Sequence, residues 1–243
     1  MAATMQQDCP VCGGTGWRIT NRDGRELAVP CECRLGAASV SVLRRTRIPP
    51  RYTQCTLDSF ELWDPTNPRL GQVQKYAREF VAAYPAVARG LLFMGRVGCG
   101  KTHLAVGVLR ELVQSKGVNG LFVNFLELVL ALQMSFDGGG RSKESILSPV
   151  TDTELVVLDD LGAGKLTPWV MDLLYHVVNS RYMHRRMTLV TTNYTDWAAP
   201  ESGEESLADR VSVRVRSRLH EMCDLLDIRS NADYRSRQAL QRR

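Results

Sequence analysis

Apolar and polar positions follow two repeating patterns through most of this chain. Short apolar runs, typical of buried strands, predict strands at residues 90–95, 119–125, 154–162, 187–193 and 223–228. Apolar residues spaced by three and four positions predict helices at residues 69–84, 101–117, 126–136, 168–186 and 204–221. Alternating strands and helices predict fold class α/β, a parallel sheet flanked by helices on both faces.

Three segments show neither the strand pattern nor the helix pattern. Residues 137–149 contain three consecutive glycines and mixed charge, which predicts a loop. Residues 1–36 are rich in cysteine and glycine and poor in large aliphatic residues, so they need a metal to hold a fold. Residues 37–55 are basic and contain a Pro-Pro pair. We therefore expect a small module at 1–36, a linker at 37–55 and the α/β domain at 56–243.

The stretch GRVGCGKT, from Gly95 to Thr102, fits the phosphate-binding pattern G-x-x-x-x-G-K-[ST]. It follows a predicted strand and opens a predicted helix, the context that separates this motif from a chance glycine-rich turn. Backbone N–H groups would surround the phosphates, Lys101 would reach the β- and γ-phosphates, and the Thr102 hydroxyl would bind Mg²⁺. The expected nucleotide-binding residues are Gly95, Gly98, Cys99, Gly100, Lys101, Thr102, His103 and, through the metal, Asp159.

Polar residues end the two following strands. Asp159 and Asp160 close the run LVVLDD, and Asn193 closes LVTTN. Asp159 is expected to hold Mg²⁺, and Asp160 to polarise the attacking water. Asn193 would hydrogen-bond the γ-phosphate or the water, although a turn or cap role is the commoner use of asparagine.

Arginines gather near the C-terminal end. Arg216 and Arg218 lie on the last predicted helix, and Arg235 follows the last strand. An arginine supplied by the same or a neighbouring subunit stabilises the transition state of phosphoryl transfer. A solvated basic face is the alternative interpretation.

The 243-residue chain has a formal net charge of +5, a mild excess compatible with a nucleic-acid partner. Because no apolar run could span a bilayer and the N-terminus lacks signal-peptide features, we expect a cytoplasmic protein without a membrane partner. Thiols stay reduced in that compartment, so paired cysteines indicate a metal. Cys9, Cys12, Cys31 and Cys33 predict a closed, structural Zn²⁺ site; a redox pair or free thiols are the alternatives.

The motifs GxxGCGKTHLA, VVLDDLG, NSRY, TTN, RSRL and DYR occur in this order. Together they resemble the DnaC/DnaI-type helicase loaders and the related IstB transposition ATPases, which are AAA+ P-loop proteins. The resemblance covers about residues 56–240. It implies that Asp160 and Asp159 form the Walker B pair and that Asn193 is sensor 1. It further implies Arg218 as an arginine finger acting in trans, with Arg216 as its alternative, and Arg235 as sensor 2 acting in cis.

The same resemblance implies an ATPase that loads a replicative DnaB-type helicase, using ATP and Mg²⁺ at the interfaces of a self-associated oligomer. Single-stranded DNA would contact residues 126–136, Arg141, Lys143 and residues 179–182. The cysteine module would grip the helicase. The alternative is an IstB-like transposition helper that binds duplex DNA and a transposase. A zinc adaptor that binds nucleotide only in order to fold is a third possibility.

Overall fold

A computed structural model of the chain divides into two units, residues 1–46 and residues 47–243. It describes residues 9–15, 17–22, 25–31, 43–137, 142–197, 203, 205–228, 230 and 233–236. None of the helices within these ranges is long and apolar enough to cross a membrane.

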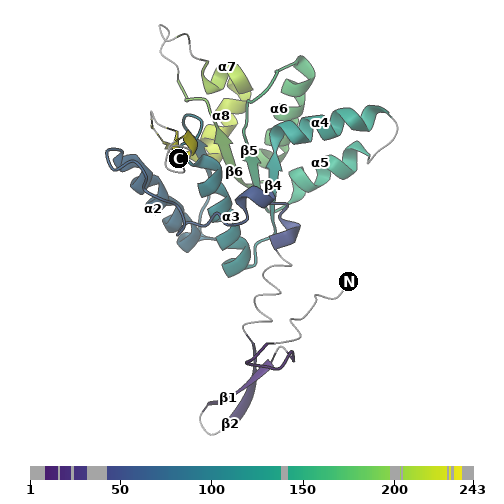
Figure 1. The fold of residues 1–243 in the computed structure, drawn as a ribbon. Helices are drawn as coiled ribbons and strands as arrows, with labels where there is room; N and C mark the ends of the chain where they lie inside the picture. Colours follow the sequence, from purple (N-terminus) through teal and green to yellow (C-terminus); the bar gives the residue numbers. More distant parts are fainter. Residues whose placement is uncertain are drawn as a thin grey trace. The chain divides into compact units, whose positions relative to one another are not determined.

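The smaller unit contains a two-stranded antiparallel hairpin. Strands β1 (Trp17–Arg22) and β2 (Arg25–Pro30) pair in register from Trp17 opposite Pro30 to Arg22 opposite Arg25. A turn that carries Cys9 and Cys12 comes before β1, and Cys31 follows β2 directly. The hairpin (Figure 1) therefore brings Cys9 and Cys31, which are 22 positions apart in the sequence, close together.

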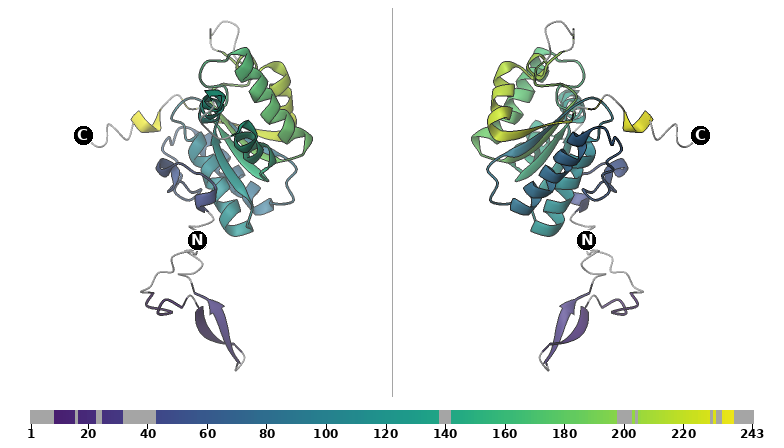
Figure 2. Two further views of the ribbon diagram at one scale, coloured as in Figure 1. Left: turned by 90° about the vertical axis from the view of Figure 1, so that its right-hand side faces the viewer. Right: turned by 90° about the vertical axis from the view of Figure 1, so that its left-hand side faces the viewer.

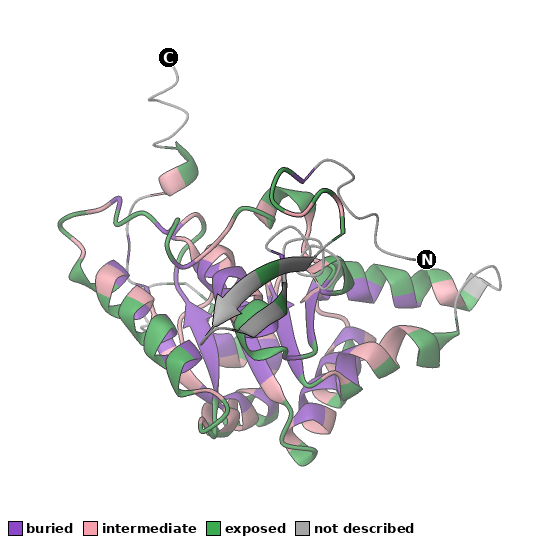
Figure 3. Cartoon of the chain, turned by 90° about the horizontal axis from the view of Figure 1, so that it is seen from below, coloured by how far each residue is buried: buried purple, intermediate pink, exposed green. Residues whose placement is uncertain are grey.

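The larger unit is built on the predicted parallel sheet, with strand order β4-β5-β6-β3-β7. Its strands are β3 (Gly90–Met94), β4 (Gly120–Asn124), β5 (Leu155–Asp159), β6 (Met187–Thr192) and β7 (Cys223–Asp227). Strands β3 and β5 are buried along their whole length, which explains their continuous apolar sequence (Figure 3). All five predicted strands are confirmed.

Helices cover both faces of the sheet, so the α/β fold class is confirmed (Figures 1 and 2). Helices α2 (Pro68–Ala83) and α3 (Lys101–Lys116) pack together on one face. The other face carries α4 (Phe125–Met134), α5 (Lys143–Asp152), α6 (Pro168–Met183), α7 (Leu207–Val211) and α8 (Val213–Met222). Apolar residues from these five helices form one core with the sheet.

Two segments differ from the sequence-based prediction. The loop predicted at 137–149 contains helix α5, because the Ser142 side chain caps the helix by accepting from Ser145 N. The helix predicted at 204–221 is broken in two at Ser212, whose φ of 73° lies outside helical space. The Ser212 hydroxyl then caps α8 by accepting from Val215 N, so the chain restarts a helix in a new direction.

Residues 47–55, expected within the linker, pack against the larger unit. The short 3₁₀ helix η1 (Pro50–Tyr52) places the ring of Tyr52 6.3 Å from that of Phe122 on β4. Arg110 of α3 donates hydrogen bonds to the carbonyls of Thr53 and Cys55. The segment is therefore packed against β4 and α3 of the larger unit.

Arg181 on α6 is fully buried, which excludes it from contact with DNA or with another subunit. Its Nε donates to Thr188 Oγ1 at 2.9 Å, and its Nη2 donates to Met187 O at 2.6 Å. Its Nη1 donates to the carbonyls of Val150 and Thr153, each at 2.9 Å. One guanidinium therefore joins the end of α5 to α6 and to the start of β6.

Replacing Arg181 with alanine should lower the free energy of unfolding by about 3 kcal/mol or more, because buried carbonyls lose their donor. Urea denaturation measures the change. Arg186→Ala, at an exposed position near the same end of α6, is the matched control and should change stability by less than about 0.5 kcal/mol. Equal effects of the two variants would contradict the assignment.

Candidate nucleotide-binding site

The phosphate-binding motif lies where the sequence places it, between the end of β3 and the start of α3. Gly100 precedes the first helical residue with a φ of 102°, a conformation that favours glycine. A Cβ at this position would also lie 2.6 Å from the ring of Phe60. Backbone geometry and the neighbouring ring therefore both require glycine at the N-terminus of α3.

A cleft of about 660 Å³ opens in front of this motif. The predicted site residues that line it are Gly98, Gly100, Lys101, Thr102, His103, Asp160, Asn193 and Arg235. A volume of this size fits a nucleotide. The Cys99 side chain is fully buried and does not line the cleft, but its sulfur lies 3.8 Å from Lys101 Nζ as a weak acceptor.

Lys101 is buried, and its ammonium group is held by three oxygen acceptors. Nζ donates to Asn193 Oδ1 and Gly95 O at 2.8 Å each, and to Arg96 O at 2.9 Å. Burial lowers the pKa of Lys101, while the nearby Cys99, Asp160 and Asp159 oppose this shift. All three oxygen acceptors are neutral, so a phosphate would offer the ammonium a stronger, charge-assisted partner.

Asp159 at the end of β5 is buried, and its Oδ1 accepts two hydroxyl hydrogen bonds. Thr102 Oγ1 donates at 2.8 Å and Thr191 Oγ1 at 2.7 Å. Burial raises the pKa of Asp159, and the bonds from Thr191 and Thr102 lower it. A carboxylate beside a hydroxyl is the oxygen donor set that Mg²⁺ prefers, so these residues fit the predicted metal.

Asp160 and Asn193 meet across the tips of β5 and β6. Asn193 Nδ2 lies 3.3 Å from Asp160 Oδ1 while its Oδ1 binds Lys101, so one amide links the lysine to the acidic residue. Asp160 has a φ of 55°, and its N–H donates to Thr191 Oγ1 at 3.0 Å. The backbone turn aims the Asp160 carboxylate into the cleft.

Two features of the site were not found from the sequence. Thr191 forms hydrogen bonds with both acidic residues, and its only signal in the sequence was its place two positions before Asn193. Residues 51–63 form a wall of the cleft, with His103 Nε2 2.9 Å from Thr56 O and 3.2 Å from Ser59 Oγ. His103 therefore anchors this wall, and burial lowers its pKa, which keeps its ring neutral at pH 7.

The three predicted arginines lie in different places. Arg235 lines the cleft, on a short turn whose Tyr234 N–H donates to Gly98 O at 3.2 Å. Arg216 and Arg218 do not line this cleft; they lie on α8, where Arg216 binds Asp196 and Arg218 stacks on tyrosine rings of α6. The structure thus brings one of the three to the nucleotide site of its own subunit.

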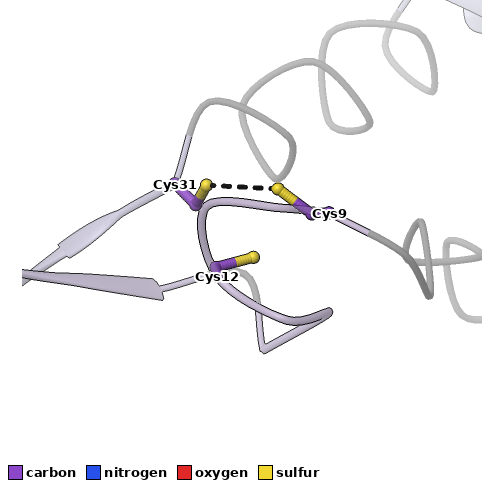
Figure 4. Close-up of side chains that lie close together, drawn as sticks. All are labelled: Cys9, Cys12 and Cys31. Carbon is purple, nitrogen blue, oxygen red and sulfur yellow. Dashed lines mark hydrogen bonds between the residues drawn. The ribbon is translucent and has the colours of Figure 1, made fainter.

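Three of the four predicted zinc ligands lie together in the smaller unit. The sulfur atoms of Cys9, Cys12 and Cys31 all lie within 4.8 Å of one another (Figure 4). The Cys9 and Cys31 sulfurs are 3.9 Å apart, too far for a disulfide and close to the spacing of about 3.8 Å that tetrahedral Zn–S bonds give. Cys33 lies outside the described residues.

Comparison with known proteins shows the family of the chain. A family model described as IstB-like ATP binding protein matches residues 42–242. The chain belongs to the IstB/DnaC family of AAA+ ATPases. A crystal structure of the DnaC helicase loader is 32% identical, with a TM-score of 0.64, covering 74% of this chain and 99% of that one.

Further proteins resemble the chain more distantly. The replicative helicase loader DnaC of Escherichia coli K12 is 24% identical over 172 residues, 71% of this chain and 67% of that protein. The phage-like element PBSX protein XkdC of Bacillus subtilis is 24% identical over 237 residues, 93% of this chain and 84% of that protein. A DnaI crystal structure, 21% identical with a TM-score of 0.58 over 77% of this chain and 94% of that one, shares the fold.

Thr191→Val, which keeps the shape but removes the hydroxyl, should weaken Mg²⁺ binding about tenfold, because Asp159 loses the donor that orients it. ATPase rate against Mg²⁺ concentration measures this, with ATP binding without metal little changed. Thr192→Val on the same strand removes a bond to Leu161 O and is the matched control. Unaltered Mg²⁺ dependence in Thr191→Val would contradict the assignment.

Proposed function

We propose that this protein is an ATP-dependent loader of a replicative DnaB-type helicase. The single observation that carries the proposal is the site itself: Lys101, Asn193 and Asp160 linked in one cleft. This site occurs in a chain that is 32% identical to a DnaC helicase loader across nearly that whole structure.

The residues of the cleft support hydrolysis of ATP. A water oxygen attacks the γ-phosphorus, the bond to the bridging oxygen breaks, and ADP leaves with the electron pair. Asp160 accepts the proton of the water, which then passes to solvent, so the products are ADP, phosphate and a proton. Lys101 neutralises phosphate charge, and Asn193 positions the water. Mg²⁺, held by Thr102 and Asp159, supplies further charge stabilisation when bound.

One arginine would complete the site from a neighbouring subunit. Arg218, the first expectation, has all three guanidinium nitrogens engaged within its own subunit: Asn179 Oδ1 at 2.9 Å, Tyr175 OH and Arg214 O at 3.2 Å. The hydrogen bonds of Arg216 use Nε and Nη2. The acceptors of Arg218 are all neutral, so a phosphate would offer it a stronger partner, whereas Arg216 is already paired with the Asp196 carboxylate. These contacts favour Arg218 as the finger in trans, with Arg216 as the alternative and Arg235 acting in cis.

Mixed oligomers test these roles. Lys101→Ala and Arg218→Ala subunits should each lose about 10³-fold in ATPase rate, and mixing them should restore part of it, because each supplies what the other lacks. Arg235→Ala mixed with Lys101→Ala should stay inactive, since an arginine acting in cis cannot be supplied by a neighbour. Restoration only with Arg216→Ala would assign the finger to Arg216.

The cysteine module supports a zinc-held surface for the helicase. The thiols of Cys9, Cys12 and Cys31, together with Cys33, would fill all four positions of Zn²⁺ and make it structural. The exposed apolar side chains Val11 and Ile19 of this module, 65% and 71% exposed, would then face a partner.

Contact with single-stranded DNA would use a different part of the protein, in the larger unit. The exposed Phe136 could stack on a base, and the ammonium of Lys143, 3.7 Å from the centre of its ring, could contact the phosphate backbone.

The full chain should contain about one Zn²⁺ and should bind the replicative helicase of its host with ATP in size-exclusion chromatography with light scattering. Cys9→Ser/Cys12→Ser should lose both the zinc and the complex, because the module loses its fold, while ATP binding persists. Cys55→Ser, outside the module, is the control. No complex with intact protein, together with binding of long duplex DNA, would indicate the transposition helper instead.

A further inference from the structure

Helix α7 carries Arg210, an arginine that contacts the turn directly after Asp160 without lining the nucleotide cleft. Its Nε and Nη2 donate to Gly162 O at 2.9 Å and 2.8 Å, and its Nη2 also donates to Gly164 O at 2.5 Å. Only 15% of the Arg210 side chain is exposed. The guanidinium is therefore engaged by the backbone of the turn rather than by solvent.

The turn after Asp160 has an unusual backbone. Asp160 has a φ of 55°, and its carbonyl accepts from Ala163 N at 3.1 Å, which closes the turn. Gly162, inside the turn, has a φ of 86°, and a Cβ there would lie 3.1 Å from Arg210 Cβ and 3.3 Å from the ring of Tyr194. A left-handed conformation at a residue other than glycine persists where surrounding contacts hold it. The contacts of Arg210 therefore help to fix the direction of the Asp160 side chain.

The same arginine packs against the neighbouring loop. Tyr194 directly follows Asn193, and the centre of its ring lies 5.1 Å from the guanidinium carbon of Arg210. Asn193 Nδ2 lies 3.3 Å from Asp160 Oδ1. Arg210 thus contacts the chain two residues after Asp160 and one residue after Asn193, so it bears directly on the distance between these two side chains.

Helix α7 is itself anchored. Ser206 and Asp209 form a capping box at its N-terminus, and Leu207 N donates to Thr195 O at 2.8 Å. Glu205 accepts from the arginine Nη1 at 3.2 Å and offsets part of its charge. The arginine therefore extends from a fixed point, which a residue that positions others requires.

We propose that Arg210 is a positioning residue that sets the distance between Asp160 and Asn193 for the attack of water on ATP. It acts through the turn at Gly162 and through the ring of Tyr194, and not by contact with the nucleotide. This inference rests on the proposed role of Asp160 as acceptor of the water proton. Because that role belongs to hydrolysis, loss of Arg210 slows hydrolysis and leaves the affinity for ATP unchanged.

The test is a double-mutant cycle in the full-length protein, with the hydrolysis rate expressed per ATP bound so that unfolded protein does not count. Arg210→Met keeps the aliphatic stem and should lower kcat roughly tenfold to a hundredfold, with the Kd for ATP changed by less than about twofold. In the Asp160→Asn background the same substitution should lower kcat by less than about twofold. The carboxylate through which Arg210 acts is then already absent.

Arg89→Met is the matched control. Arg89 also donates to two backbone carbonyls, those of His220 and Cys223, but it does not line the cleft and does not contact its loops. Its loss should leave kcat per bound ATP close to that of the unmodified protein. Arg210→Lys keeps the charge without the two-nitrogen fork, and it replaces Arg210→Met if that variant does not fold. It should show a smaller loss with the same dependence on Asp160.

Three results would overturn the proposal: an unchanged kcat for Arg210→Met, an equal loss in the presence and absence of Asp160, or a loss explained by weaker ATP binding. Each leaves the proposed function standing if Asp160→Asn alone lowers kcat and the unmodified protein binds the helicase. An unchanged kcat for Asp160→Asn alone would overturn the role of Asp160 together with this inference, so the single variant separates the two cases.

Discussion

Two opposite charges lie buried at the carboxyl edge of the sheet, and the arrangement of the larger unit depends on keeping both hydrogen-bonded. Burial disfavours the charged form of Lys101 and of Asp159 alike. The fold compensates the lysine with the carbonyls of the phosphate loop and with Asn193, and the aspartate with two threonine hydroxyls. These partners come from different strands and loops. The order of the strands in the sheet therefore brings together the hydrogen bonds that offset the cost of burying the two charges.

The same hydrogen-bond partners position Lys101, Asp159 and Asp160 in the site before a nucleotide binds. Neutral acceptors hold the Lys101 ammonium in the cleft, and a phosphate would offer it a charged partner in their place. Thr191 serves both acidic residues, since its hydroxyl donates to Asp159 and accepts from the Asp160 backbone. A single side chain on the middle strand therefore links the carboxylate of Asp159 to the backbone of Asp160, the two residues proposed to bind the metal and to polarise the water.

The elements after β6 connect this site to the outer face of α8. The break at Ser212 redirects the chain, so α8 returns along α6 and places Arg216 beside the loop that begins at Asn193. Another arginine, Arg210 on α7, donates to the carbonyls of Gly162 and Gly164 in the loop after Asp160. The loops that follow β5 and β6 thus each accept hydrogen bonds from an arginine, Arg210 of α7 and Arg216 of α8 respectively.

The sequence alone determined the sheet and its phosphate-binding motif, because short apolar runs and glycine spacing are local properties of the chain. It also indicated Asp159, Asp160, Asn193 and Arg235, since the ends of parallel strands meet at one edge and Arg235 belongs to a motif with a characteristic place. Helix α5 and the break at Ser212 were missed, because a serine cap and one unusual φ value leave no periodic signal.

Only the tertiary structure decided which polar residues carry the site and which carry the fold. Arg181 and Arg216 look alike in the sequence, two arginines on predicted helices. One is enclosed by backbone carbonyls and holds the core together, whereas the other forms a largely buried ion pair with Asp196 on the loop after β6. The reason is physical: the partner of a charged side chain is set by long-range packing, and no pattern in neighbouring residues specifies it.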